Sequence, residues 1–509
     1  MVSCSVARII YPSDIMDKKI AIIAVVAIVI VVAAAAFVLM NNNSSDDDDK
    51  TVGEKNKAEF TKVWNEKYKD GDVLFPARLL ILGNADLDDD LDNDDINAIN
   101  KLIKNGYTYS KDFMADANYD GVIDSKDIDY LKKLMDYNNY KGIAYYFNCD
   151  FKIASYNMAN PVKTSNILTQ TLEMLCVIAP ESVIAVDDRC ANSQISGANP
   201  QGTYWKEFAS VLDYSKLGSV GSHKSPNSER YLEVAKQYGG GYLTAVMNAS
   251  DAQSTGYLEQ QLEGTNVQII RCPSWERGGV DNGMLLLGFL FHKYDRAIEW
   301  VTWHDSYYDD IMDKVSKLTE SQKKKVAVGV LGDTDVAIAQ QIELNYTTSA
   351  EWQGLKRMGV IDVGGDYLAK TTGVAGYGAW SQTISKESFV TMCTEAGGLD
   401  YYIGTVPGPY NVAPVNESKP TVETYMSTMS SFLEEYCEGT TLQVIGWQYS
   451  SGPNDLLYYA TLANVLYGWD YDLETIINEG LEWMGVYGDG EYEWTFDKIK
   501  ANTLLPYDI

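Results

Sequence analysis

Short apolar runs alternate with helical patterns along most of the chain after residue 145. The runs are nearly continuous, which is typical of strands in a parallel sheet whose two faces are covered by helices. Helical patterns lie between them, at 228–238, 351–358 and 422–436. This alternation predicts an α/β fold. The predicted strands are 151–154, 182–186, 243–247, 267–271, 326–331, 401–405 and 442–447.

A long amphipathic pattern divides this region into two. Between 282 and 318 the apolar residues recur at spacings of three, four and seven, as on one face of a helix. At 1.5 Å per residue such a stretch could reach about 50 Å, with a break near His292 as the alternative to one continuous helix. The pattern predicts two α/β lobes, residues 145–281 and 321–509, joined by a helix over 282–320.

An uninterrupted apolar run without a charged residue occupies positions 20–40. At about 1.5 Å per residue it covers the roughly 30 Å hydrocarbon core of a membrane. Basic residues precede it and an acidic, polar stretch follows, so residues 1–19 are expected in the cytoplasm. A cleaved signal peptide is the alternative, although its apolar region is usually shorter. We expect a single-pass anchor in the cell membrane, with 41–77 a polar linker to an extracytoplasmic body.

The excess of acidic residues argues against a nucleic-acid partner. The chain has 71 acidic and 41 basic residues and a formal charge of -30. A surface of this sign repels phosphate backbones, so no nucleic-acid partner is expected. Its seven cysteines contain no Cys-x-x-Cys pair, which argues against zinc ribbons and thioredoxin-type sites and leaves any disulfide pairing open.

Two stretches between residues 84 and 127 have the spacing of calcium loops. The second, Asp116 to Asp127, has oxygen-bearing side chains at alternate early positions and Gly121 where the chain must turn. The first lies 32 residues earlier and has Asn84 for the leading Asp and Asp89 in place of glycine. An acidic surface hairpin without metal is the alternative. The predicted ligands are Asn84, Asp86, Asp88, Asp90 and Asp95 in the first loop and Asp116, Asn118, Asp120, Val122 (backbone carbonyl) and Asp127 in the second.

Each loop is followed by a helical pattern, and this duplicated unit, from about Leu80 to Tyr137, resembles a type I dockerin. The resemblance implies a small α-helical module over 78–140, calcium as its cofactor and a cohesin-type protein as partner. A calcium-stiffened spacer is the alternative to a docking role.

Several stretches of the two-lobed region carry a resemblance to a known family: 182–188, 282–288, 294–297, 326–331 and 446–453. In these stretches the region resembles the substrate-binding proteins of iron–siderophore and cobalamin ABC importers. The family's opening Ser-Pro-Ser-x-Thr-Glu is replaced by 157–161 and 170–173, which leaves the ligand class open. The resemblance implies two Rossmann-like lobes joined by a long helix, no enzymatic activity, an ABC permease as partner and a metal chelate (ferric siderophore, haem or cobalamin) as ligand.

In that family each lobe offers a surface glutamate to an arginine of the permease. The matching residues here are Glu229 and Glu387, each near the start of a predicted helix. The alternative is two ordinary carboxylates stabilised by the helix dipole.

Residues that follow the carboxyl ends of the strands are candidates for ligand contact, because α/β sheets open toward a crevice there. Aromatic faces with a few polar groups suit a large, flat or chelated ligand, and each residue could instead serve packing. The candidates are Tyr156, Asn157, Asp188, Arg189, Trp275 and Arg277 in the first lobe and Asp333, Trp380, Tyr410, Trp447 and Tyr449 in the second.

The common catalytic motifs of hydrolases, zinc proteases and nucleotide-binding enzymes are absent from the sequence. Asp187 and Asp188 are adjacent, and neighbouring carboxylates in a turn need not converge on one substrate as a glycosidase pair must. We therefore expect a binding protein. The alternative function is a dockerin-bearing cell-surface assembly or adhesion protein that binds glycan or peptide.

Overall fold

The computed structural model describes most of the chain after residue 49. It divides the chain into two compact units, Met1–Lys55 and Asn56–Ile509, and the features below belong to the second. No helix among the described residues is long and apolar enough to cross a membrane, and the predicted anchor at 20–40 lies outside them. The described residues are 50–70, 75–195, 208–250, 255–274, 279–330, 341–345, 350–372, 381–406, 422–446, 451–485 and 504–505.

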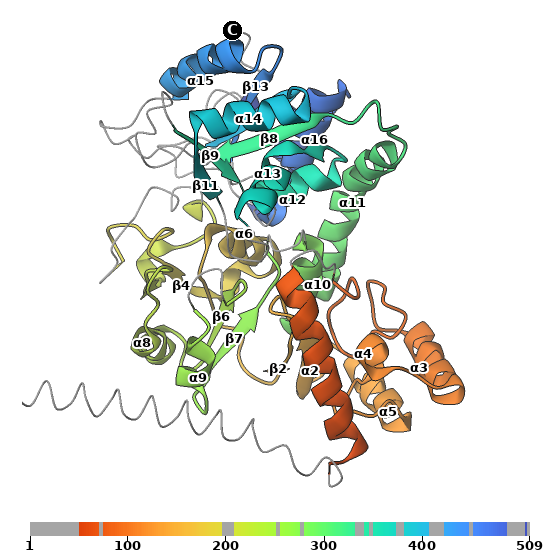
Figure 1. The fold of residues 1–509 in the computed structure, drawn as a ribbon. Helices are drawn as coiled ribbons and strands as arrows, with labels where there is room; N and C mark the ends of the chain where they lie inside the picture. The colour runs from red at the N-terminus through yellow and green to blue at the C-terminus, as the bar shows by residue number, and fades with distance from the viewer. Residues whose placement is uncertain are drawn as a thin grey trace, which may run out of the picture. The chain divides into compact units, whose positions relative to one another are not determined.

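The first sheet has five strands, all parallel, which confirms the α/β prediction for this region. Alternate residues of β6 face two cores: Ala245 packs in the cluster that contains helices α8 and α9, and Val246 in the cluster that contains α6 and α10. Helices therefore cover both faces of the sheet (Figure 1). The strands, in sheet order, are β5 (Gly218–Gly221), β4 (Val183–Asp187), β3 (Thr164–Asn166), β6 (Leu243–Met247) and β7 (Val267–Arg271). The helices are α6 (Thr169–Ile178), α8 (Ser228–Tyr238), α9 (Leu258–Leu262) and α10 (Val280–Leu290).

The second sheet is mixed. Its three central strands are parallel, and antiparallel strands join at both sides. The strands, in sheet order, are β11 (Ser381–Ser385), β9 (Gln341–Asn345), β8 (Lys325–Val330), β12 (Tyr401–Val406), β13 (Thr441–Gly446) and β14 (Leu504–Leu505), with β10 (Ile361–Asp362) paired to β8. The helices of this region are α12 (Ala350–Arg357), α13 (Val363–Thr372), α14 (Lys386–Ala396), α15 (Val422–Tyr436), α16 (Asp455–Tyr467) and α17 (Leu473–Met484).

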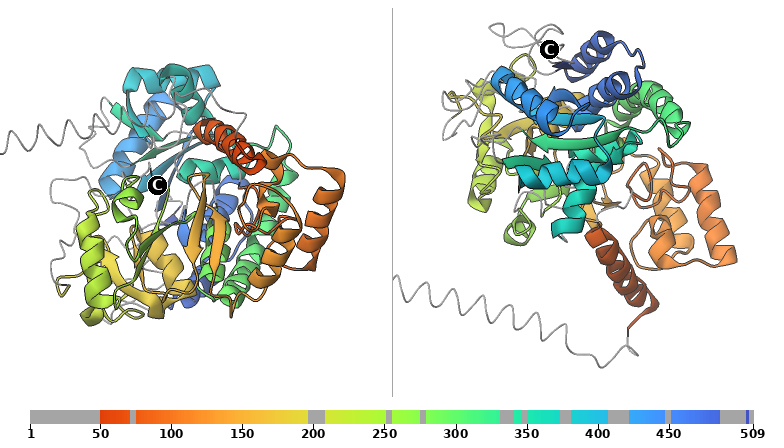
Figure 2. Two further views of the ribbon diagram at one scale, coloured as in Figure 1. Left: turned by 90° about the horizontal axis from the view of Figure 1, so that it is seen from below. Right: turned by 45° about the horizontal axis from the view of Figure 1, so that its top comes forward.

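Two helices, rather than one, connect the sheets. Helix α10 ends at Leu290 and α11 (Tyr294–Ser316) begins after a turn in which His292 has a φ of 59°. The helices cross closely at Gly288, where an added Cβ would lie 2.4 Å from that of Ala297. Figure 2 shows α11, in green, beside the blue C-terminal helices. The connection is therefore broken near His292, as in the alternative to one continuous helix.

One apolar core continues through the connection. It contains Leu175 of α6, Leu286 of α10, Trp300 of α11, Leu462 of α16 and Val328 of β8. Because packed interiors resist deformation, this shared core limits how far the two sheets can move relative to each other.

The region before the first sheet contains more structure than expected. Residues 41–77 were expected to be a polar linker, but helix α2 (Val52–Asp70) lies within them. Phe60 and Trp64, four residues apart on one face, are buried against Phe113 and Phe147. Two aromatic residues in an otherwise polar stretch gave too weak a periodicity to predict the helix. The other elements of this region are α3 (Asn93–Asn105), α4 (Tyr109–Asp112), α5 (Ser125–Leu134) and the hairpin β1 (Ile143–Phe147) and β2 (Ile153–Asn157).

Candidate functional site

The carboxyl ends of the first sheet form the best-defined candidate site among the described residues. Strands β4 and β5 lie on one side of β3, whereas β6 and β7 lie on the other. The strand order reverses between β3 and β6, and such a switch point is where open α/β sheets bind ligands. Asn166 ends β3, Asp187 ends β4 and Asn248 follows β6.

Asp187 holds two strand ends together. Its Oδ2 accepts a hydrogen bond from Asn166 Nδ2 at 2.8 Å, and its Oδ1 accepts one from the backbone N–H of Arg189 at 2.6 Å. Burial raises the pKa of Asp187 to about 7, although Arg189 opposes the shift. Asp188 is also engaged, since its Oδ1 accepts from Ser219 Oγ at 2.8 Å. The two carboxylates have separate structural partners, which argues against a glycosidase pair.

Arg271, which ends β7, is likewise structural. It is buried, with its guanidinium donating to Glu259, to Thr255 and to the backbone carbonyl of Asn248. These bonds fix the connection between β6 and α9 and leave Arg271 little capacity for a ligand.

At this edge, the buried side chains of His223 and Asn248 have no hydrogen-bond partner among the described residues. His223, just after β5, is 2% exposed and neither ring nitrogen is hydrogen-bonded. Asn248 is fully buried and neither atom of its amide is bonded. Leaving such a group unpaired costs about 1–3 kcal/mol, so each unpaired group in a native protein requires an explanation such as a ligand.

His223 is an uncharged imidazole at neutral pH. Burial, with smaller contributions from the positive charges of Arg189 and Lys224, lowers its pKa to about 3. A neutral imidazole can coordinate a metal or exchange hydrogen bonds with a ligand. Arg189 is half-buried and close enough to influence His223, so the edge combines a cation, an imidazole and an amide.

The second lobe reaches this edge through residues 451–454. Gln170 Nε2, in the first turn of α6, donates to Ser451 Oγ at 3.2 Å, and the Gly452 N–H donates to the carbonyl of Ser274 at 2.9 Å. Gly452 has a φ of 73°, and a Cβ there would lie 2.6 Å from Oε2 of Glu173. The positive φ favours glycine at this position.

The structure brings only part of the predicted ligand set to the edge. Arg189 and Asp188 lie there, whereas Tyr156 and Asn157 do not, because β2 belongs to the antiparallel hairpin and not to the parallel sheet. Tyr156 bonds Thr244, and the N–H of Asn157 donates to Gln268, near the amino ends of β6 and β7. The remaining candidates, Trp275, Arg277, Asp333, Trp380, Tyr410, Trp447 and Tyr449, lie outside the described residues.

His223 and Asn248 were missed by the sequence reasoning. Asn248 directly follows a correctly predicted strand, so the carboxyl-end rule alone could have found it. His223 follows β5, whose sequence Gly-Ser-Val-Gly lacks the apolar run used to identify strands.

The two expected permease-docking residues are exposed in the first turns of separate helices, Glu229 in α8 and Glu387 in α14. A backbone hydrogen bond and a side-chain bond with Ser385 lower the pKa of Glu387. Favourable placement at a helix start accounts for both positions equally well.

The second calcium loop has several features of a cation site. Asp116 and Asp127 are fully buried, and burial raises both their pKa values, that of Asp127 to about 7. Tyr119 and Gly121 have φ values of 54° and 90°, which curl the loop. A divalent cation would compensate the buried carboxylates, so the donor set suits calcium.

The first loop departs from this geometry. Asp89 does not adopt the left-handed conformation and instead pairs with Arg78 at 3.0 Å. The Asn84 amide is used in hydrogen bonds to the carbonyls of Leu79 and Asp88. Asp95 is buried, with a pKa that burial raises to about 7.

The carboxylates that lie close together in the structure are not the predicted calcium ligands as a set. Within the described part of the chain, one group of three has oxygens all within 4.8 Å of one another: the exposed Asp86, Asp92 and Asp94. Asp88, Asp90 and Asp95 are not in this group, and no three carboxylates of loop two converge to that distance. A bound cation would therefore have to draw the loop-two ligands inward.

Arg78 links the calcium-loop region to the connecting helices. Besides Asp89, it pairs with Asp305 of α11 at 2.9 Å and Asp281 of α10 at 3.4 Å. A cavity of about 510 Å³ lies beside it, with His304, Arg357 and Asp455 also in its wall. Most charged groups in this cavity have protein partners, so we interpret it as a structural joint.

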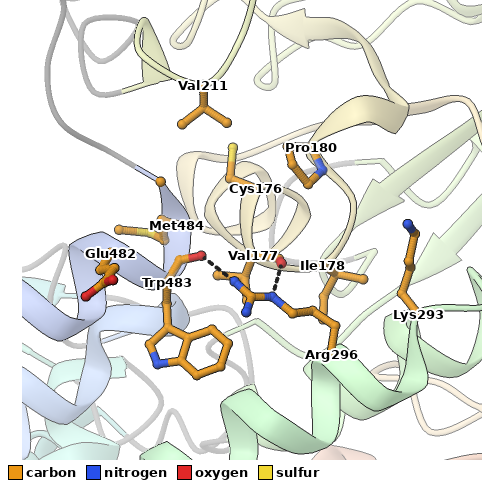
Figure 3. Close-up of a pocket in the computed structure, with 11 residues that line it drawn as sticks. Cys176, Val177, Ile178, Pro180, Val211, Lys293, Arg296, Glu482, Trp483 and Met484 are labelled. Carbon is orange, nitrogen blue, oxygen red and sulfur yellow. Dashed lines mark hydrogen bonds between the residues drawn. The ribbon is translucent and has the colours of Figure 1, made fainter.

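A second cavity, of about 410 Å³, lies where α6, α11 and α17 meet (Figure 3). Arg296 of α11 donates from Nε to the carbonyl of Val177 and from Nη2 to the carbonyl of Trp483, at 3.3 and 3.2 Å. Its guanidinium also lies 4.1 Å from the Trp483 ring centroid. Arg296 therefore joins the ends of a helix from each side of the connection.

Sequence comparisons find no matching family model and no matching curated protein. Several solved structures match this chain in fold comparison, at low sequence identity. A TroA-like periplasmic binding protein FepB from Veillonella parvula has 12% identity and a TM-score of 0.48 over 67% of this chain and 95% of that chain. An ABC transporter solute binding protein from Sulfurospirillum deleyianum has 14% identity and 0.48 over 71% and 99%. The periplasmic haem binding protein HutB of Vibrio cholerae has 12% identity and 0.40 over 60% and 99%.

Proposed function

We propose that this chain is the extracytoplasmic solute-binding component of an ABC importer and captures a metal chelate. The observation that carries the proposal is the polar edge of the first lobe, where the buried side chains of His223 and Asn248 lack hydrogen-bond partners within the described part of the chain. The edge lies at a topological switch point and is contacted by residues 451–454 of the second lobe. A ligand enclosed between two α/β lobes would occupy this position.

The chemistry of the edge suits a chelate of the ferric siderophore, haem or cobalamin type. Neutral His223 can coordinate an open position of the metal or bond to the chelating groups. Asn248 offers both a donor and an acceptor, and Arg189 can pair with carboxylates of the ligand. Recognition of this kind requires no catalytic group.

Small movements suffice for capture under this proposal. The apolar core that runs through α10, α11 and α16 ties both sheets to the connecting helices. We expect closure by a limited hinge rotation, with Glu229 and Glu387 presented to a permease from separate lobes. Residues 20–40 would hold the protein at the membrane, as a single-pass anchor.

The calcium-loop region fits a stiffening role better than a free docking role. Asn282 of α10 donates to the backbone carbonyls of Ala77 and Arg78, and Tyr137 donates to Asp295 of α11 at 2.6 Å. These contacts support the spacer alternative, in which calcium in loop two braces the connection. A cohesin-binding assembly protein would need an accessible module, and this attachment favours import.

Binding titrations test the proposal. The purified full-length chain, in mild detergent, is titrated by calorimetry with haem, a ferric hydroxamate siderophore and cobalamin, and with the metal-free siderophore as control. We expect one of the three chelates to bind with a Kd in the micromolar range or tighter. Absence of binding to all three, together with binding to a glycan or peptide library, would support the assembly alternative instead.

A further inference from the structure

Helices α14 and α15 pack against each other on the outer side of the second lobe. The rings of Phe389 and Phe432 have centroids 5.5 Å apart, and Lys386 Nζ lies 3.5 Å from the centroid of the Tyr436 ring. Lys386, Phe389 and Cys393 follow one face of α14 at spacings of three and four. Cys393 is therefore on the face of α14 that contacts α15.

Cys437 comes directly after α15 and meets Cys393. Both side chains are buried, at 6% and 3% exposure, and both belong to the same apolar cluster. Each thiol shifts the pKa of the other, which is expected of side chains that lie close together. Both are free thiols in this structure.

We propose that Cys393 and Cys437 form a disulfide bond when the chain is exposed to an oxidising environment. The two thiols lose two protons and two electrons as the S–S bond forms. The electrons reduce a disulfide, either of a thiol–disulfide oxidoreductase or of a small molecule such as oxidised glutathione, to two thiols. Cys437 attacks that disulfide and releases one thiol, and Cys393 then attacks the mixed disulfide and releases the second.

The electrostatics of the pair suit this order of attack. The neighbouring Cys393 thiol lowers the pKa of Cys437, and the Thr440 hydroxyl contributes in the same direction. The neighbouring Cys437 thiol, together with burial, raises the pKa of Cys393. The thiolate is the attacking species in disulfide exchange, so Cys437 is the expected nucleophile. Because both thiols are buried, oxidation should be fastest while α15 is still docking during folding.

The bond would tie together the two helices that flank β12 in sequence. It closes the chain between residues 393 and 437, which includes β12 and the positions that follow its carboxyl end. It would also brace α14, the helix that carries Glu387. The inference that the bond forms in the cell rests on the proposed function, which places this region outside the cytoplasm. The inference that the bond forms in the purified protein does not depend on that proposal.

Peptide mapping tests the proposal in two arms. In one arm, the full-length chain is expressed with export and purified in the presence of iodoacetamide. In the other, the reduced, purified chain is refolded in a glutathione redox buffer and then alkylated. We expect a cross-linked peptide pair containing Cys393 and Cys437, so that at least two of the seven cysteines escape alkylation. Cross-linking in the refolded arm alone would support the disulfide and count against export.

Stability measurements provide an independent readout. Oxidation should raise the Tm of the wild type and of Cys176→Ser by at least about 3 °C, and should not raise that of Cys393→Ser or Cys437→Ser through this bond. If either serine variant fails to fold, the peptide map of the wild type still decides. Full alkylation of both cysteines in both arms, or stable pairing of either one with another cysteine, would overturn the proposal. Neither result would affect the chelate titrations.

Discussion

His304 shows how a single buried group ties two elements together. It lies in α11, stacked between the rings of Trp300 and Tyr308, and its Nε2 lies 3.0 Å from Asp455 of α16. Burial alone would lower its pKa, but Asp455 and Asp305 outweigh that effect and raise the pKa to about 10. The imidazolium is therefore part of the folded structure at neutral pH, in contrast to the neutral His223.

The raised pKa of His304 predicts that the stability of the protein depends on pH. The folded pKa of His304 lies above the unfolded value of about 6.5, so its contribution is complete below that pH and is lost as the pH rises toward 10. The free energy of unfolding should fall by as much as about 1.4 kcal/mol per pH unit between pH 7 and 9.5. Urea unfolding across this range measures the slope. His304→Gln should be less stable at pH 7 and show a flatter dependence, whereas an unchanged slope would contradict the assignment.

Calcium loops one and two should respond differently to substitution. Asp116→Asn removes a charged ligand of loop two, so it should reduce or abolish the rise in Tm that calcium produces. Asn84→Ala removes hydrogen bonds to Leu79 and Asp88, so it should lower Tm with or without calcium and leave the calcium-dependent rise in place. At 100 times its Kd, calcium would stabilise the wild type by about 2.7 kcal/mol. Thermal unfolding in calcium and in chelator separates the two effects, and equal loss of the calcium response in both variants would refute the distinction.

At the scale of elements, helix ends are the sites where the lobes are joined. The carbonyls at the ends of α6 and α17 are among those that a helix leaves without internal partners, and Arg296 of α11 bonds to one from each helix. Arg296 of the connecting helix α11 thus binds the end of α6 and the end of α17.

Removing this side chain should weaken the joint. Arg296→Ala should lower the free energy of unfolding by about 1–3 kcal/mol, because two partly buried carbonyls lose a charged donor. Arg296→Lys should recover only part of the loss, since an ammonium group lacks the planar fork that reaches both acceptors. Arg230→Ala, whose side chain makes a surface ion pair with Glu233, is the matched control and should cost less than about 1 kcal/mol. Equal effects at the two arginines in urea unfolding would contradict the role given to Arg296.

Elements with continuous apolar runs were predictable from the sequence. Strands β4, β6, β7, β12 and β13 lie within one or two residues of the predicted positions. Strand β3 is central but consists of Thr-Ser-Asn, and the hydrogen bonds that hold Thr164 and Asn166 in place are tertiary contacts that no local pattern reveals. Without β3 and β5, the sequence placed Tyr156 rather than His223 at the edge. The sequence therefore predicted the carboxyl edge of the sheet, and only some of the residues that the structure places there.

At the scale of the whole chain, shared packing explains how a calcium-loop region could influence ligand capture. Leu79 and Leu134 belong to the same apolar core as α6, α10 and α16. The region is therefore packed against the two-lobed body, at the helices that connect its lobes. Loop one departs from the calcium pattern at Asp89 and Asn84, and both residues have structural roles instead. Asp89 pairs with Arg78, which joins the region to the connecting helices, and the Asn84 amide bonds to the carbonyl of Asp88 within the turn.

The most direct test of the central claim compares chelate binding by the wild type with binding by His223→Ala. The full-length chain is titrated with the chelate that binds best, and Lys236→Ala, an exposed substitution on α8, is the control. We expect the His223 variant to bind at least about 10-fold more weakly, equivalent to 1.4 kcal/mol, and the control to match the wild type. Because the pKa of His223 is about 3, the difference should persist at pH 5.5. Wild-type affinity in His223→Ala, with the fold intact by circular dichroism, would contradict the placement of the ligand at this edge.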